Sequence, residues 1–387
     1  MKNVVLRRGK EKALSNKHHW IFSGAVLNLP EFTDGEILPV YSEGGKLLGS
    51  GYFNRKAKII GRMLTFDAQD PLDMIKKHID SAIDLRKALF DQKATTAYRL
   101  INAEGDFIPG LIVDRYGSTL VLQVSTLGID RLKHEIVDYL RLKLNPTLIY
   151  EKSQVPSRRE EGLNDAVGVL YGELSGDIEI LENGLKFFVS ITEGQKTGFF
   201  LDHREMRQRI RGMANQKRVL NCFSYTGGFS VYAAAGGALA VDSVDISEKA
   251  VAYAERNMAL NGSGVNNRFI AEDVFQFLRN NDLHYDLVIL DPPAFAKKQR
   301  DVVQGCRGYK DINRVAMQKM PAKSYLLTCS CSHYVDEVLF QKVVFQAAVE
   351  AGREVKIIGR HDMASDHPIN ICHPESDYLK SLLVYIE

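Results

Sequence analysis

The second half of the chain alternates short apolar runs with helical segments, from about residue 185 to the end. The runs are typical of strands and lie at residues 218–222, 240–244, 267–271, 287–290, 325–328, 355–358 and 382–386. Strands that alternate with helices in this way indicate a parallel α/β sheet. Seven such strands predict a complete doubly wound, Rossmann-like sheet, whose ligands lie at the carboxyl ends of the strands.

The first half of the chain has a different pattern. Residues 1–70 contain short apolar runs broken by glycine, which predict a small β-barrel or sandwich. A long amphipathic helix is expected from Pro71 to about Lys93, because apolar residues recur there at helical spacing. After it we expect a central α+β module, with a helix near 129–144 and strands near 98–102, 110–114, 119–124 and 147–150.

The composition excludes several classes of protein. Among 387 residues, 50 are Lys or Arg and 48 are Asp or Glu, so the net charge of +2 does not by itself indicate a nucleic acid or membrane partner. No apolar stretch is long enough to cross a membrane, and the basic N-terminus lacks the apolar core of a signal peptide. The five cysteines are odd in number and lack metal-ligand spacing, which argues against disulfides and metal sites and for the cytoplasm.

The first candidate site follows the strand at 218–222, in the sequence Asn-Cys-Phe-Ser-Tyr-Thr-Gly-Gly at 221–228. The two glycines let a ligand approach the backbone, and the helix that follows offers free N–H groups. The turn is neither G-x-G-x-x-G nor a P-loop, which disfavours a pyrophosphate cofactor. A tight turn without a ligand is the alternative for these residues alone.

Acidic residues follow the next two strands. Asp245 lies about twenty residues after the glycines, where a carboxylate accepts hydrogen bonds from both hydroxyls of a ribose. Asp273 is placed either to cap a helix or to contact the amine of an adenine. With the glycine turn, these acids predict an adenosine pocket, and the missing diphosphate grip favours S-adenosylmethionine over NAD.

Two prolines follow the strand at 287–290, in the sequence Asp-Pro-Pro-Ala-Phe at 291–295. They predict a rigid loop that holds Asp291 at the sheet edge, where its carboxylate can bond to a nucleobase. The same pattern is typical of enzymes that methylate exocyclic amines, so it predicts a base as substrate without naming the target atom. A loop that serves packing alone is the alternative.

Two cysteines follow the strand at 325–328, in the sequence Thr-Cys-Ser-Cys-Ser at 328–332. Most free cysteines are inert, and we interpret Cys222, Cys306 and Cys372 in that way. A thiolate at the mouth of a cofactor cleft is instead a strong nucleophile. Addition of a thiolate to C6 of cytosine makes C5 reactive toward a sulfonium methyl group, whereas methylation of a nitrogen needs no cysteine.

Six motifs, taken in order, resemble those of the bacterial RlmI-type methyltransferases, which use S-adenosylmethionine to make 5-methylcytosine in 23S ribosomal RNA. The resemblance runs nearly end to end, and its motifs lie at 7–12 with 20–26, 194–204, 221–228, 291–295, 306–313 and 330–332. It implies three parts: a PUA-like RNA-binding barrel (1–72), a linker helix with a central strand-strand-helix-strand-strand module (73–183), and a class I methyltransferase domain (184–387).

The resemblance also implies roles for single residues. Cys331 is the implied nucleophile, and Asp291 faces the target base. The glycine-flanked loop at 194–198 is implied to close over the cofactor. Without the resemblance, the same residues could equally form a surface turn. The implied cofactor-binding residues are Gln195, Thr197, Phe199, Arg204, Asn221, Phe223, Ser224, Tyr225, Thr226, Gly227, Gly228, Asp245, Ile246, Asp273, Asp291 and Pro292.

The cysteine motif departs from the family pattern at one position. The family usually has Thr-x-Ser-Cys-Ser, and x is here a second cysteine, Cys329. More distant RNA cytosine methyltransferases place the nucleophile in Thr-Cys-Ser, which also matches 328–330. The register of the closer family favours Cys331 over Cys329.

Basic residues support an RNA partner at two places. Solvated charge is the usual reading of such runs, but the second cluster borders the predicted cleft and includes an aromatic residue expected to stack on a base. The predicted RNA-binding residues are Arg7, Arg8 and Lys10 near the N-terminus, and Lys297, Lys298, Arg307, Tyr309 and Lys310 after the double proline.

Two alternatives to a cytosine-C5 methyltransferase of large-subunit ribosomal RNA stay open. One is methylation of a guanine or adenine nitrogen, for which Asp-Pro-Pro-Phe suffices. The other is a noncatalytic RNA-binding or assembly factor, while a nicotinamide dehydrogenase fits least. The sequence does not identify the target nucleotide, and it does not distinguish a monomer from a homodimer.

Overall fold

The second half of the chain forms the predicted seven-stranded sheet, in a computed structural model that describes residues 2–262 and 264–387. In spatial order its strands are β16 (Asn266–Ala271), β15 (Ala240–Asp245), β14 (Arg218–Cys222), β17 (Leu287–Leu290), β18 (Ser324–Ser330), β20 (Lys380–Ile386) and β19 (Val355–His361). Neighbours from β16 to β18 are parallel, whereas β20 is antiparallel to both β18 and β19. All seven predicted strands are therefore confirmed.

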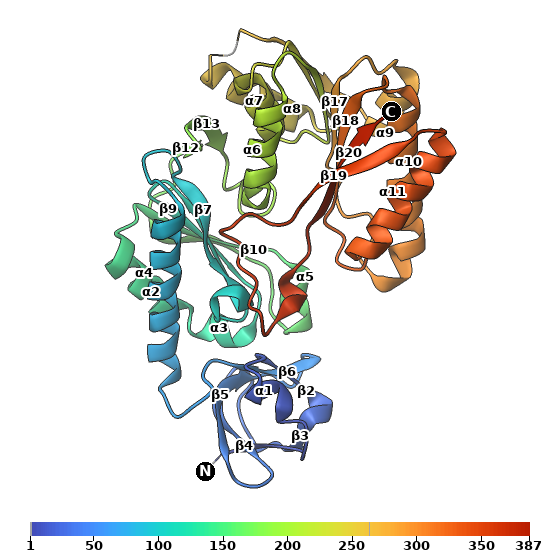
Figure 1. The fold of residues 1–387 in the computed structure, drawn as a ribbon. Coiled ribbons are helices and arrows are strands. Elements are labelled where there is room, and N and C mark those ends of the chain that lie inside the picture. The colour runs from blue at the N-terminus through green and yellow to red at the C-terminus, as the bar shows by residue number, and fades with distance from the viewer. Residues whose placement is uncertain (1, 263) are drawn as a thin grey trace. The chain divides into compact units, whose positions relative to one another are not determined.

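Helices cover both faces of this sheet (Figure 1). Those of one face are α6 (Arg204–Met213), α7 (Gly228–Ala235) and α8 (Glu248–Leu260), and those of the other are α9 (Val274–Asn280), α10 (Val302–Lys319) and α11 (Glu337–Ala351). The five inner strands, β15, β14, β17, β18 and β20, are buried between the two layers, which explains why they read as apolar runs. The edge strands β16 and β19 are partly exposed.

The N-terminal region forms a six-stranded sheet with its own apolar core. Its strands, in spatial order, are β2 (Trp20–Phe22), β6 (Ile59–Met63), β5 (Leu47–Phe53), β4 (Ile37–Ser42), β1 (Val4–Leu6) and β3 (Val26–Asn28), and a short helix α1 (Lys12–Ser15) precedes β2. Four strand pairs of this sheet are antiparallel, and β1 with β4 is the parallel pair.

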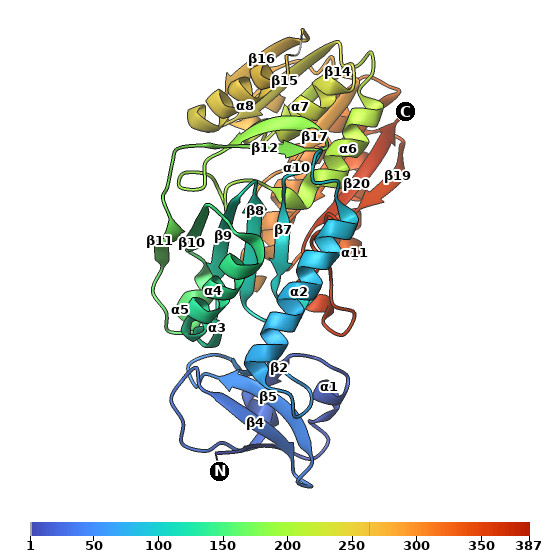
Figure 2. The same cartoon turned by 90° about the vertical axis from the view of Figure 1, so that its left-hand side faces the viewer.

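Helix α2 (Pro71–Leu89) leads from this sheet to the central one and packs against β7 (Figure 2). Asp70 caps its start by accepting hydrogen bonds from the N–H groups of Leu72 and Asp73, and Pro71 occupies the first turn. The helix buries Ile75, Ile79 and Ile83, which recur every four residues.

The central sheet has five strands, in the spatial order β11 (Ala166–Gly172), β10 (Leu148–Ser153), β9 (Thr119–Val124), β8 (Leu111–Tyr116) and β7 (Ala97–Asn102). Its helices are α3 (Leu127–Arg131), α4 (Lys133–Leu144) and α5 (Pro156–Glu160), and a two-stranded sheet of β12 (Ile178–Glu182) and β13 (Leu185–Val189) follows. Three strands precede α3, as the apolar runs at 98–102, 110–114 and 119–124 predict, which is one more than the order implied by the resemblance. A two-residue turn joins β8 to β9.

The described chain packs as two compact units. The first contains the residues up to Gly184 together with two later segments, Val189–Leu201 and Ser365–Ser376. The second contains Leu185–Phe188, Asp202–Ala364 and Asp377–Glu387. No helix in the described ranges is long and apolar enough to cross a membrane.

Candidate active site and cofactor turn

In the second unit, the carboxyl ends of β14, β15, β17 and β18 lie at one edge of the sheet, because these strands are parallel. The glycine turn follows β14, Asp245 ends β15, Asp291 follows β17 and Cys331 follows β18. The motifs that the sequence singles out are therefore brought to the same edge.

The turn between β14 and α7 has an unusual backbone. Phe223 (φ 57°), Tyr225 (φ 47°) and Gly227 (φ 79°) all lie in the left-handed region. Each non-glycine residue in this region costs about 1–3 kcal/mol, and such strain gathers at functional sites. The conformation supports a turn that is shaped for a ligand.

Gly227 is required by the fold itself. A Cβ atom built on it would lie 2.8 Å from the Cβ atom of Ala254 in α8, and its φ angle also disfavours a side chain. Close packing of α8 on the turn, in addition to any ligand, therefore accounts for this glycine.

The polar groups of the turn are partly satisfied within the protein. Asp245 accepts hydrogen bonds from the N–H of Tyr225 (2.9 Å) and from the N–H of Ser247 (2.9 Å). The hydroxyl oxygens of Ser224 and Thr226 are buried and have no hydrogen-bond partner among the described residues. Buried hydroxyls of this kind fit a polar ligand that supplies the partners.

Three other predicted cofactor residues occupy distinct environments. Ile246, directly after Asp245, is 73% exposed, which leaves an apolar surface for an aromatic ring to cover. Asp273 caps α9 by accepting a hydrogen bond from the N–H of Gln276 (3.0 Å), so the helix-cap alternative is confirmed. Asn221 is buried and donates to the hydroxyl of Ser230 (2.9 Å), which places its amide beneath the turn.

The loop residues Gln195, Thr197 and Phe199 belong to the first unit, whereas Arg204 begins α6 in the second. Thr197 is buried and donates to the carboxylate of Asp114 (2.6 Å) on β8. The N–H of Phe199 donates to the hydroxyl of Tyr116 (3.2 Å), also on β8. The central sheet therefore fixes the shape of this loop.

Asp291 lies next to a histidine that sequence reasoning did not single out. The Nε2 atom of His203 is 3.4 Å from a carboxylate oxygen of Asp291, and the side chains are 5% and 22% exposed. The ring of His203 also contacts the edge of Phe229 in α7. His203 lies inside the 194–204 motif, and that position was the one signal in the sequence that could have marked it as a site residue.

The two thiols have different environments. Cys329 is fully buried, its Sγ atom lies 3.9 Å from the Sδ atom of Met206, and burial raises the pKa of its thiol well above the ordinary value. Cys331 is half-buried just beyond β18, with its Sγ atom 3.9 Å from the carbonyl oxygen of Pro292. Of the two, Cys331 is the more exposed thiol, and exposure is one requirement for a reactive cysteine.

Tyr309 does not form a stacking surface, contrary to the sequence-based expectation. Its side chain is fully buried, because α10 presents it to the interior, and its hydroxyl lies 2.8 Å from the hydroxyl of Ser332. The same Ser332 oxygen accepts a hydrogen bond from the N–H of Ala296 (3.1 Å). Tyr309 therefore supports the contact between the double-proline loop and the cysteine turn.

The remaining predicted RNA contacts are mostly exposed. Arg7, Arg8 and Lys10 extend from the loop after β1 in the first unit. In the second unit Lys310 forms an ion pair with Glu350 (2.6 Å), so its charge is already partly neutralised. The exposed basic side chains near the double proline are Lys297, Lys298 and Arg307.

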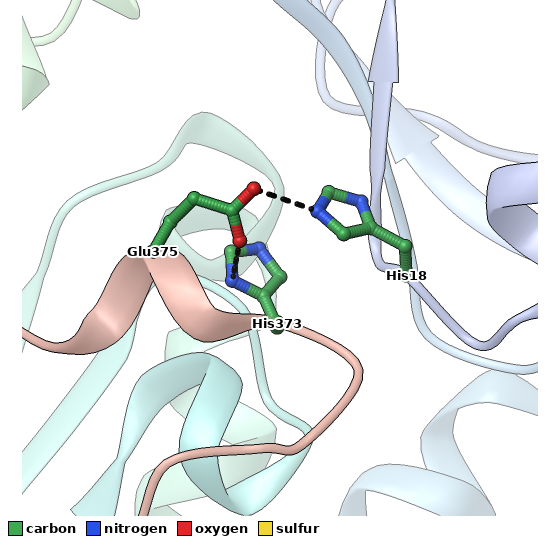
Figure 3. A group of neighbouring side chains, drawn as sticks. All are labelled: His18, His373 and Glu375. Atoms are coloured by element: carbon green, nitrogen blue, oxygen red, sulfur yellow. Dashed lines mark hydrogen bonds and ion pairs between the residues drawn. The ribbon is translucent and has the colours of Figure 1, made fainter.

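A separate cluster in the first unit joins His18, His373 and Glu375 (Figure 3). The carboxylate of Glu375 lies 3.2 Å from Nε2 of His18 and 3.0 Å from Nδ1 of His373. The two imidazole rings are stacked at an angle of 11°, so their in-plane lone pairs do not converge on one point. We interpret the cluster as a clamp between the N-terminal sheet and the 365–376 segment rather than as a metal site.

Models of known protein families match an N-terminal and a C-terminal region of the chain. A family model for S-adenosylmethionine-dependent methyltransferases matches residues 157–362, and a model for PUA-like domains matches residues 4–66. A solved structure described as a candidate SAM-dependent methyltransferase from Streptococcus mutans has 27% identity, covers 99% of this chain and 100% of its own, and superposes with a TM-score of 0.84. Another, a candidate methyltransferase complexed with SAH, has 27% identity and a TM-score of 0.86 over the same share of each chain.

Curated relatives are more similar in sequence. The protein named ribosomal RNA large subunit methyltransferase I in Aeromonas salmonicida is 41% identical over 389 residues, which cover 98% of each chain. The protein of the same name in Vibrio cholerae is 41% identical over 97% of each chain. The chain therefore belongs to the family of S-adenosylmethionine-dependent methyltransferases that includes the proteins named ribosomal RNA large subunit methyltransferase I.

Proposed function

We propose that this protein methylates C5 of a cytosine in large-subunit ribosomal RNA through a covalent intermediate on Cys331. The names of its relatives support the RNA substrate. The observation that carries the chemistry is the half-buried thiol of Cys331 beside the carbonyl of Pro292, at the sheet edge that also holds Asp245 and Asp291. The five free thiols of the chain fit a reducing compartment, which we take to be the cytoplasm.

The residues around the β14 turn fit the cofactor. The unsatisfied hydroxyls of Ser224 and Thr226 offer hydrogen bonds, the carboxylate of Asp245 can accept ribose hydroxyls, and Ile246 offers an apolar face to adenine. The resemblance to the family assigns Gln195, Thr197, Phe199 and Arg204 to the methionine end of the cofactor, and we include that assignment in this proposal. S-adenosylmethionine supplies an electrophilic methyl group, which C5 accepts as S-adenosylhomocysteine is released.

The reaction begins with the target base unstacked from the RNA, because its ring atoms are inaccessible within a helix. The thiolate of Cys331 forms a bond to C6, and the electron pair of the C5–C6 double bond makes C5 nucleophilic. Asp291, held beside His203, stabilises or protonates N3 of the base as negative charge develops on the ring. After methylation a base removes the proton from C5, the double bond re-forms, and the Cys331 thiolate is expelled.

RNA that contains 5-fluorocytosine tests this proposal, since fluorine at C5 cannot leave as a proton and the thiol adduct persists. We expect the wild-type protein, with S-adenosylmethionine, to form a covalent complex that survives denaturing electrophoresis. Cys331→Ala should abolish the complex and methyl transfer while it keeps cofactor binding in calorimetry. Cys329→Ala is the matched control and should still form the complex.

The opposite result would support the second candidate, methylation of a purine nitrogen by way of Asp291, Pro292 and Phe295. In that case Cys331→Ala would methylate at the wild-type rate, and the modified RNA nucleoside would be a methylated guanosine or adenosine rather than 5-methylcytidine.

A further inference from the structure

A lysine from the last strand lies beside the cysteine turn. Strand β20 runs antiparallel to β18, so β20 begins at the edge where β18 ends, and Lys380 pairs directly with Ser330. Lys380 is therefore brought to the active-site edge although it is 49 positions from Cys331 in the sequence. Only the antiparallel direction of this strand produces that arrangement.

The ammonium group of Lys380 is held in a defined position. Its Nζ atom donates to the carbonyl oxygen of Ser332 (2.8 Å) and to the carbonyl oxygen of Tyr378 (2.8 Å). The residue is only 8% exposed. A buried charge is costly, so an ammonium group kept here and tied to the residue after Cys331 needs a reason beyond packing.

We propose that Lys380 is a positioning residue for Cys331: it fixes the Ser330–Ser332 turn and places a positive charge that favours the Cys331 thiolate. This inference rests on the proposed role of Cys331. A cation near a thiol stabilises the thiolate and raises its reactive fraction at neutral pH.

The other titratable groups around the turn would not supply this effect. Asp291 follows β17 and has a carboxyl group, which cannot supply a positive charge; Cys329 precedes the turn, and Tyr309 packs against it from α10. Burial lowers the pKa of the Lys380 ammonium group, whereas Asp377, Cys331 and Asp336 act in the opposite direction and favour its charged form. His203 lies beside Asp291 and Cys329 and is a cation only when it is protonated. Lys380 is the cation that is hydrogen-bonded to the cysteine turn itself.

Alkylation of Cys331 by iodoacetamide as a function of pH tests the inference, without RNA or cofactor and with the modified peptide quantified by mass spectrometry. Lys380→Met removes both charge and donor, Lys380→Gln keeps an amide donor without charge, and Lys380→Arg keeps the charge. We expect the Met and Gln variants to raise the apparent pKa of Cys331 by about one unit, and the Arg variant to stay near wild type.

The rate change at pH 7 should be smaller than the pKa change alone suggests. A one-unit rise lowers the thiolate fraction about tenfold, but the more basic thiolate is also more nucleophilic, so the net rate falls about threefold. Lys342→Met, at an exposed lysine on α11, is the matched control and should leave the profile unchanged.

Circular dichroism shows which variants are folded. If Lys380→Met fails to fold, Lys380→Gln is the variant that tests the loss of charge. A wild-type alkylation profile in folded Lys380→Gln would overturn the inference. Failure of the proposed function looks different, because 5-fluorocytosine RNA would then not be trapped even where the pKa of Cys331 responds to Lys380.

Discussion

At the scale of single residues, Ser332 connects the parts of the candidate active site. Its hydroxyl meets Tyr309 from α10 and the N–H of Ala296 from the double-proline loop, and its carbonyl accepts from Lys380 of β20. Three segments distant in sequence therefore fix the residue next to Cys331. Preorganisation of this kind keeps a reactive group in one geometry before the substrate arrives.

The first prediction concerns Tyr309. Tyr309→Phe keeps the buried ring and removes only the hydroxyl that bonds to Ser332, so we expect the free energy of unfolding to fall by about 1 kcal/mol. Urea denaturation measures this change. Tyr325→Phe is the control, because the hydroxyl of Tyr325 bonds to no other residue in the described ranges, and a larger loss in the control would contradict the prediction.

The second prediction concerns pH. His19 is buried, its Nδ1 atom lies 2.9 Å from the carbonyl oxygen of Met63, and burial lowers its pKa from 6.5 to about 4. Between these values the unfolded chain binds the proton and the folded chain does not, so stability falls as pH decreases. We expect His19 to account for about 2 kcal/mol of the loss between pH 8 and pH 5.

His19→Asn tests this expectation, since the asparagine amide can still donate to the Met63 carbonyl. Urea denaturation at several pH values should show a smaller acid-induced loss of stability in the variant than in the wild type. Equal slopes for the two proteins would show that His19 titrates alike in the folded and unfolded states.

At the scale of elements, parallel strands explain why much of the site can be predicted from sequence. Their carboxyl ends meet at one edge, so Asp245, Asp291 and Cys331 could be assigned from strand periodicity and the polar residue that follows each strand. Lys380 could not, because apolar periodicity does not report the direction of a strand. Tyr309 was misplaced because the buried face of α10 depends on tertiary packing.

The loop at 190–199 illustrates how one element shapes another. The central strand β8 holds it through Thr197, which donates to Asp114 and also contacts the hydroxyl of Tyr116 (2.8 Å). Thr197→Val keeps the shape of the side chain and leaves these buried groups without that partner. We expect a loss of about 2 kcal/mol in unfolding free energy and weaker binding of S-adenosylhomocysteine in calorimetry.

Thr192→Val provides the comparison within the same loop, because Thr192 is exposed. It should bind S-adenosylhomocysteine as the wild type does. If Thr197→Val and Thr192→Val behave alike, the buried contacts to β8 do not shape the loop.

At the scale of the whole molecule, the chain returns to its first unit near the end. Asp366 is fully buried there: its carboxylate accepts from the N–H of Arg99 (2.8 Å), and its carbonyl accepts from the guanidinium of Arg86 (2.8 Å). Arg86 also forms a two-bond ion pair with Asp106 (2.6 and 2.8 Å). The strand rhythm predicts the sheets on either side, but a loop between β19 and β20 carries no periodicity that would reveal its destination.

Asp366→Ala should therefore loosen the first unit rather than the seven-stranded sheet. We expect faster hydrogen exchange at β7, which contains Arg99, with little change in β14 and β15. Asp362→Ala, at an exposed position just before the segment, should exchange as the wild type does. Uniformly faster exchange in both units would contradict this local effect.

The late position of Asp366 also matters for biosynthesis. Translation proceeds from the N-terminus, and domains of long chains commonly fold in the order in which they emerge from the ribosome. Here the interior of the early half is complete only after the chain has been made as far as Asp366. A nascent chain that stops before residue 366 would thus carry Arg86 and the N–H of Arg99 without these partners.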